Sequence, residues 1–183
     1  MVDPILRRIR LFGPFDGTAA SEVIAQLLFL HKRDQLEPIT LEIDSPGGSL
    51  TGSLGILGAM RQVTCPVHTL CRVQCSGTAL LLFSHGTKGQ RVANPEAVFI
   101  LYRTRGVAPA GNPAQSAELL KQFHQRIVKE FSEATGLPLS QIEEMMNAGK
   151  PLTAAQAQRM GFLDVIEGGS SRDNDSQRLP QDV

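Results

Sequence analysis

Hydrophobic residues follow two alternating spacings along most of the chain. Short, nearly continuous apolar runs predict buried strands, and apolar residues that recur at helical spacing predict amphipathic helices. The predicted strands are Ile9–Phe12, Ile39–Ile43, Val67–Val73, Ala97–Tyr102 and Phe162–Ile166. The predicted helices are Ala19–His31, Ser49–Val63, Thr78–Ser84, Ala114–Thr135, Ser140–Asn147 and Ala154–Met160. Repeated strand–helix units with apolar strands indicate an α/β fold in which helices cover a mostly parallel sheet.

The longest predicted helix departs from this alternation. It spans Ala114–Thr135, follows the segment Arg103–Pro113 that glycine and proline interrupt, and ends at Gly136. Its apolar stripe suits either packing against the core or contact with another subunit. The chain becomes polar after residue 167, so we expect one domain over residues 1–167 and a disordered tail over residues 168–183.

Composition narrows the function classes without naming one. The chain has 183 residues, of which 42% are hydrophobic, which is enough for one substantial core. Lysine plus arginine equal aspartate plus glutamate at 18 each, so no net field attracts nucleic acid or an anionic membrane. Apolar runs such as Ala79–Phe83 are too short to cross a bilayer.

Cysteine usage is typical of a reducing compartment. The 3 cysteines are odd in number, lack CxxC spacing and lie in apolar surroundings: Cys65, Cys71 and Cys75. We therefore expect free thiols in a cytoplasmic protein, with no metal and no cofactor.

Two turns carry the candidate chemistry. In the first, LEIDSPGGS over Leu41–Ser49, a strand stops at Pro46 and turns through Gly47 and Gly48. A strand end of this kind predicts exposed main-chain N–H groups, which suit an extended peptide or an oxyanion. In the second turn, Ser76 stands between a strand and a helix, where a serine serves either as a nucleophile near the helix N-terminus or as an N-cap.

Several short motifs occur in a fixed order: RIRLFG, VIAQLLFL, LEIDSPGGSLTGS, SGTALLL, HGTKGQR and LTAAQAQRMGFLDVI. In this order the chain resembles the Clp protease proteolytic subunit (ClpP) family over about residues 8–167. The resemblance implies a ClpP/crotonase-like ββα spiral with a mostly parallel sheet and a protruding handle helix at about 114–135. An SPGG turn alone also fits a crotonase-like acyl-CoA-binding protein, because the crotonases share this spiral.

The resemblance implies a Ser-His-Asp triad that this chain does not complete. The family's nucleophile matches Ser76 if one residue is dropped before the serine, which we favour; without that gap Gly77 takes its place. The base position carries Leu101, and the aspartate position carries Met145. Leucine cannot accept a proton and methionine cannot orient an imidazole. We therefore predict a degenerate triad and an inactive or very weak peptidase.

No other side chain in the sequence is an obvious replacement for the base. We expect the histidines to lie away from Ser76: His31, His68, His85 and His124. Tyr102, Arg103 and Arg105 directly follow the missing base and are candidates to line the groove, but an arginine stays protonated. An active serine endopeptidase with an unconventional base remains the alternative.

The binding and assembly parts of the family are better kept. The resemblance gives Gly47 and Gly48 an oxyanion-hole and strand-pairing role, with Gly77 adding a second N–H, so peptide binding without cleavage is reasonable. Family members stack rings of subunits through the long helix. We therefore expect a homo-oligomer, or a structural or regulatory subunit of a ring shared with paralogous subunits. A Clp-type ATPase is a further possible partner, and Pro109 before the helix places the family's ring stacking in question.

Overall fold

The computed structural model describes residues 2–3, 6–103 and 113–168. Within these residues, six strands form the larger sheet, whose strand order is β1-β2-β3-β4-β6-β9. Only β1 is antiparallel to its neighbour; the other pairs are parallel. The strands are β1 (Val2–Asp3), β2 (Arg8–Phe12), β3 (Ile39–Asp44), β4 (Val67–Cys71), β6 (Arg91–Ala93) and β9 (Val165–Ile166). The predicted α/β fold with a mostly parallel sheet is confirmed.

A smaller sheet continues from the end of the larger one. It holds β5 (Gln74–Ser76), β7 (Val98–Ile100) and β8 (Pro151–Thr153). In this sheet β5 and β7 are parallel, whereas β8 runs antiparallel to β7. The sequence predicted one strand over Val67–Val73; the structure instead has β4 and β5 in different sheets, with a turn at residues 72–73 between them.

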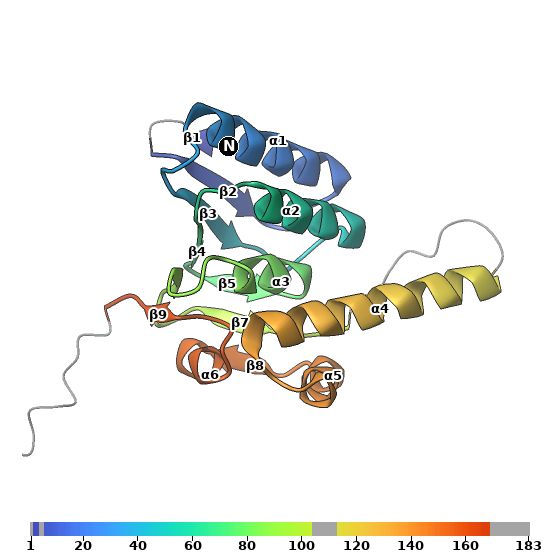
Figure 1. The fold of residues 1–183 in the computed structure, drawn as a ribbon. Coiled ribbons are helices and arrows are strands. Elements are labelled where there is room, and N and C mark those ends of the chain that lie inside the picture. The colour runs from blue at the N-terminus through green and yellow to red at the C-terminus, as the bar shows by residue number, and fades with distance from the viewer. Residues whose placement is uncertain (1, 4–5, 104–112, 169–183) are drawn as a thin grey trace, which may run out of the picture.

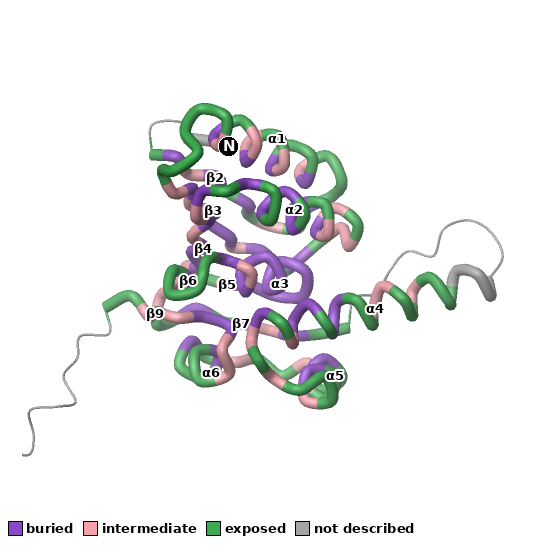
Figure 2. The backbone as a smooth tube through the Cα atoms, viewed as in Figure 1, coloured by how far each residue is buried: buried purple, intermediate pink, exposed green. Residues whose placement is uncertain are grey.

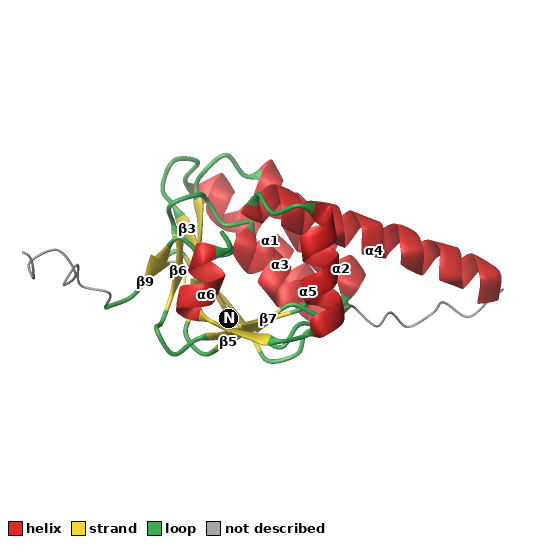
Figure 3. Cartoon of the chain, turned by 90° about the horizontal axis from the view of Figure 1, so that it is seen from below, coloured by secondary structure: helices red, strands yellow, loops and turns green. Residues whose placement is uncertain are grey.

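The helices lie mainly on one face of the larger sheet (Figure 1 and Figure 3). They are α1 (Gly17–Arg33), α2 (Leu50–Gln62), α3 (Thr78–Ser84), α4 (Pro113–Thr135), α5 (Leu139–Ala148) and α6 (Ala154–Arg159). Every residue of α3 is buried, so this helix forms the centre of the core (Figure 2). No helix in the described part of the chain is both long and apolar enough to cross a membrane. All 3 cysteines are buried free thiols.

One buried arginine ties several elements together. Arg91 on β6 is 2% exposed, and its Nε and Nη2 donate to the Asp164 carboxylate at 2.8 and 2.5 Å. Its Nη1 donates to the carbonyl oxygens of Ser84 (3.2 Å), Ala134 (3.3 Å) and Gly161 (2.7 Å). The Ser84 and Ala134 carbonyls lie at the ends of α3 and α4, and the Gly161 carbonyl follows α6. Arg91 therefore fixes three helix ends and the segment before β9 against the sheet.

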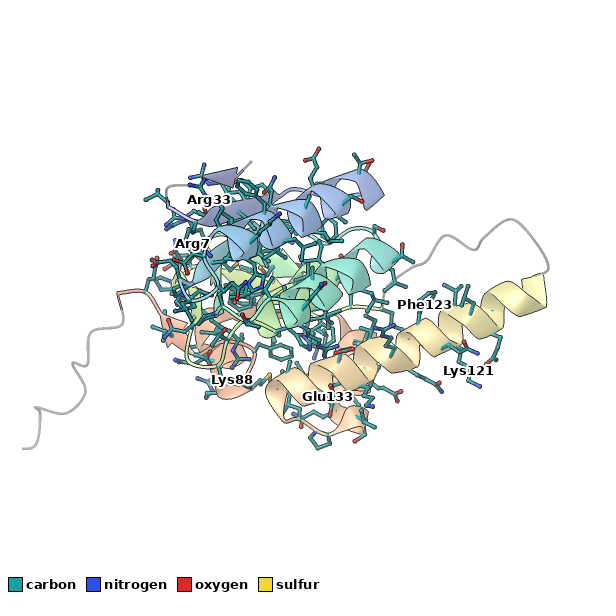
Figure 4. All side chains as sticks on the ribbon, turned by 45° about the horizontal axis from the view of Figure 1, so that its top comes forward. Arg7, Arg33, Lys88, Lys121, Phe123 and Glu133 are labelled. Carbon is teal, nitrogen blue, oxygen red and sulfur yellow. The ribbon has the colours of Figure 1, made fainter. Side chains whose placement is uncertain are left out.

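Helix α4 projects well beyond the rest of the fold (Figure 1). Its inner half packs into the core through Ile127, Val128 and Phe131, and Arg61 of α2 pairs with Glu130 at 2.5 Å. Lys121 and Phe123 lie farther out along the helix than Glu133 (Figure 4). The apolar stripe thus has a core-packed inner part and an outer part that other elements cover incompletely.

Two of the predicted segments lie mostly outside the described residues. The glycine- and proline-interrupted segment lies largely in residues 104–112, and the tail lies almost entirely in residues 169–183, both outside the described residues. The tail boundary and the effect of Pro109 on ring stacking stay predictions.

Replacing Asp164 by asparagine tests the Arg91 anchor. The change removes the charge that Arg91 pairs with, and we expect it to lower the free energy of unfolding by about 3 kcal/mol. The measurement is urea denaturation followed by circular dichroism. The matched control is Glu167→Gln, because Glu167 is an exposed carboxylate 3.7 Å from Arg72, and a loss under about 0.5 kcal/mol is expected there. Equal losses in both variants would contradict the anchor.

The same pair gives a pH dependence. Burial alone would raise the pKa of Asp164, but hydrogen bonds from the Arg91 guanidinium and from the N–H groups of Arg91 and Gly89 outweigh it and hold the pKa below its ordinary 3.8. A lowered pKa means that the pair stabilises the fold at pH values above 3.8 and loses this contribution as pH falls through the lowered value. We expect Asp164→Asn to show a shallower loss of stability than wild type in this acid range, measured by denaturation at a series of pH values.

Candidate functional site

The two turns singled out in the sequence meet at one edge of the fold. The end of β3 lies against β5, because Ser45 N–H donates to the Gln74 carbonyl at 2.8 Å and Ser76 N–H donates to the Ser45 carbonyl at 3.0 Å. The end of β7 joins them through a hydrogen bond from Gly77 N–H to the Ile100 carbonyl at 2.9 Å. The glycine turn, the serine turn and the segment after β7 therefore form one site.

A carboxylate at the end of β3 shapes this edge. Asp44 Oδ1 accepts hydrogen bonds from the N–H groups of Arg72 (2.9 Å), Val73 (2.7 Å) and Gln74 (3.2 Å). These bonds satisfy the backbone of the turn between β4 and β5. They explain why the apolar run over residues 67–73 does not continue as one strand.

Ser76 does not face the groove. Its side chain has no exposed surface, and its Oγ accepts a hydrogen bond from Gln74 Nε2 at 2.9 Å. It is not the N-cap of α3 either, because that position belongs to Gly77. Gly77 has φ 52° and ψ −121°, a sharp strand-to-helix turn of the kind that presents a nucleophile in other hydrolases. The tip of the turn is thus a residue without a side chain.

Apolar residues pack at both positions where the sequence led us to expect the base and its orienting acid. Leu101 is 1% exposed and belongs to the core. Met145 on α5 is half-buried and packs against the same core. Neither lines the groove.

The histidines lie outside the groove. All 4 lie in the described residues, and none lines the groove: His31, His68, His85 and His124. The His85 side chain is 11% exposed, and its Nδ1 contacts the Leu81 carbonyl at 2.9 Å near the far end of α3. Burial lowers the pKa of His85 despite the nearby Glu130 carboxylate. The prediction that the histidines lie away from the site is confirmed.

The prediction of free glycine amides was wrong. Gly47 N–H donates to Ser45 Oγ at 3.0 Å, and Gly48 N–H donates to Thr78 Oγ1 at 2.9 Å. Gly77 N–H is used by Ile100. Serine and threonine hydroxyls readily form hydrogen bonds with nearby backbone groups. The sequence could not show that Thr78 lies beside a turn 30 residues away.

Tyr102 covers the place where these glycines meet. Its hydroxyl donates a hydrogen bond to the Pro46 carbonyl. A Cβ at Gly77 would lie 2.7 Å from Tyr102 Cζ, and a Cβ at Gly47 would lie 3.1 Å from the hydroxyl. Burial raises the pKa of Tyr102. The sequence indicated Tyr102 only as a groove-lining residue, because its contact with Gly77 requires the end of β7 to lie beside β5.

A groove of about 910 Å³ runs from the glycine turn to α5. Its walls mix apolar, polar and basic groups: Pro46, Gly47, Gly48, Thr78, Tyr102, Arg103, Met146, Asn147 and Gly149. Tyr102 and Arg103 line it as predicted, whereas Arg105 lies outside the described residues. A groove of this size can take a short extended peptide, but among the described residues that line it there is no serine, cysteine or histidine to form a nucleophile–base pair. Among the described residues, no three histidine, cysteine, aspartate or glutamate side chains come together as metal ligands would.

Comparison with known families adds one finding. The family model described as Clp protease matches residues 5–169. This range contains the glycine turn, the serine turn, α4 and the Arg91–Asp164 pair.

Substitution of Gly77 tests the crowding under Tyr102. Gly77→Ala forces a side chain into a strained conformation and against the Tyr102 ring, so we expect a loss of about 3 kcal/mol in the free energy of unfolding. In a Tyr102→Ala background the same change should cost only about 1–2 kcal/mol, which denaturation of the double-mutant cycle measures.

Gly149→Ala is the control for a positive φ without a neighbouring side chain. Gly149 also has a positive φ, 58°, but a Cβ there meets nothing within 4 Å, and we expect a loss of about 1 kcal/mol. An additive cycle at positions 77 and 102 would contradict the contact.

Proposed function

Because the chain belongs to the Clp protease family, we propose that it is a Clp-type ring subunit that has lost peptidase activity. The observation that carries this proposal is that the serine turn has no nucleophilic side chain at its tip. Its tip is Gly77, while Leu101 and Met145 stand where the family's base and acid are expected. We therefore align the family's nucleophile without a gap, which places it at Gly77 and not at Ser76.

The size of the expected loss follows from how a triad works. A serine hydroxyl needs an adjacent base to become a nucleophile, and the base needs an orienting group. Removing triad members typically lowers kcat by about 10⁴ to 10⁶. With no hydroxyl at the turn tip and no histidine in the groove, the active-enzyme alternative with an unconventional base has no group to start from among the described residues.

The proposed role is structural or regulatory, in a ring of identical or paralogous subunits. Members of this family typically form oligomeric rings. The outer part of α4 supports an assembly role, because Leu119 is 39% exposed and Phe123 is only half-buried. Binding of a Clp-type ATPase to such a ring is a further part of the proposal. The family match favours this branch of the superfold over an acyl-CoA-binding crotonase.

A peptide groove without cleavage is the second candidate function. The 910 Å³ groove beside the glycine turn favours it. Its amide donors are already used within the chain, so an incoming peptide has to exchange partners with Ser45 and Thr78. This competition makes tight peptide binding the weaker proposal.

Peptidase and labelling assays test the proposal directly. We expect the purified protein to hydrolyse a small fluorogenic peptide no faster than buffer, and a fluorophosphonate probe to leave it unlabelled. The control is Ser76→Ala, which should behave identically in both assays. Hydrolysis or labelling that Ser76→Ala abolishes would restore Ser76 as the nucleophile and overturn the proposal.

Native mass measurement tests the assembly role. We expect a ring-sized multiple of the 19.8 kDa chain, either alone or after mixing with an active paralogous subunit. A chain that stays monomeric in both conditions would contradict a ring function.

A further inference from the structure

We propose that Tyr102 and Thr78 seal the glycine turn from within, so that the resting site is closed to peptides. This inference deepens the proposed function and rests on the placement of the family's site at Gly47, Gly48 and Gly77. It goes beyond the loss of catalysis, because a site without a nucleophile can still hold a substrate.

The first observation is that main-chain N–H and C=O groups of the glycine turn already have hydrogen-bond partners within the chain. Thr78 Oγ1 accepts from Gly48 N–H at 2.9 Å and donates to the Gly48 carbonyl at 3.3 Å. Tyr102 takes the Pro46 carbonyl. A peptide that adds as a strand needs main-chain N–H and C=O groups of this kind as partners. In this turn, side chains of the same chain already bind both a main-chain donor and main-chain acceptors.

The second observation is steric. Gly77 is buried although it forms the tip of a turn, and it does not line the groove. The Tyr102 ring occupies the space above it, with Cζ, Cε2 and the hydroxyl oxygen all 2.7–2.8 Å from a Cβ placed on Gly77. The ring therefore stands where the side chain of a nucleophile would project and where a scissile bond would approach.

The seal is local and can move. Tyr102 keeps 37% of its surface exposed, and its hydroxyl donates a hydrogen bond to the Pro46 carbonyl. The α5 side of the groove, at Met146 and Asn147, remains open. In a ring that contains active subunits, such a seal keeps this subunit from retaining peptides that its neighbours cleave.

Thiol accessibility at position 78 tests the part of the seal that Tyr102 provides, because Thr78→Cys removes the Thr78 hydroxyl in every variant. Thr78 is 3% exposed although it lines the groove, and Thr78→Cys is a change of similar volume at the first residue of α3. The native thiols are buried, so iodoacetamide should report Cys at position 78 alone. We expect alkylation in the folded, assembled protein to be about tenfold faster after Tyr102→Ala. A tenfold factor corresponds to a loss of about 1.4 kcal/mol in the free energy that favours the closed site over the open one.

Tyr102→Phe separates the ring from its hydroxyl. It keeps the steric cover but loses the bond to Pro46, so an intermediate alkylation rate is expected. The wild-type chain and Tyr102→Ala with Thr78 retained give the background from native cysteines. Equal rates with Tyr, Phe and Ala at position 102 would overturn the seal.

A second measurement needs no variant. The chain has 1 tyrosine and no tryptophan, so its near-ultraviolet phenol absorbance reports Tyr102 alone. We expect the phenol to ionise above its ordinary pKa in the folded protein and to return to that value in urea. Titration at the ordinary value in the folded state would overturn the seal even if Thr78→Cys failed to fold. Neither readout depends on peptide hydrolysis, so their failure is distinguishable from failure of the proposed function.

Discussion

The buried guanidinium of Arg91 is the interaction on which the arrangement of the outer elements depends. A charge this deep is tolerated only when it is paired and fully hydrogen-bonded, and Asp164 and three carbonyl groups meet that need. The carbonyls lie at the ends of α3 and α4 and after α6. Arg91 holds the inner end of helix α4 in place, and Lys88 also donates to the Ala134 carbonyl there.

A second polar constraint positions the site. The Asp44 carboxylate ends β3 by binding three N–H groups of the turn between β4 and β5. This turn moves β5 out of the larger sheet and against β7, which brings Gly77 beside Tyr102. The site is thus built by backbone hydrogen bonding at strand ends, and its geometry does not depend on any catalytic side chain. Such a scaffold can keep its shape while the chemistry is lost.

Three residues near the site are held by packing contacts. Leu101 and Met145 contribute to the core, and Tyr102 fills the space above Gly77. A histidine or aspartate at the first two positions would need partners in an apolar environment, because an unpaired buried polar group is costly. The apolar side chains of Leu101 and Met145 therefore fit the fold without hydrogen-bonding partners of their own.

The sequence by itself determined the α/β class, the positions of the long helix and of both turns, and the family resemblance. These follow from local periodicity, from proline and glycine at strand ends and from motif order. The separation of β4 from β5, the burial of Ser76, the capture of the Gly48 amide by Thr78 and the cover over Gly77 were decided only by the tertiary structure. The contacts of Asp44 with the turn after β4, of Thr78 with Gly48 and of Tyr102 with Gly77 join residues far apart in the chain, and neither residue of such a pair carries a local signal of its partner. The role of Gly77 at the turn tip could be decided only by its backbone angles and by the ring that lies against it.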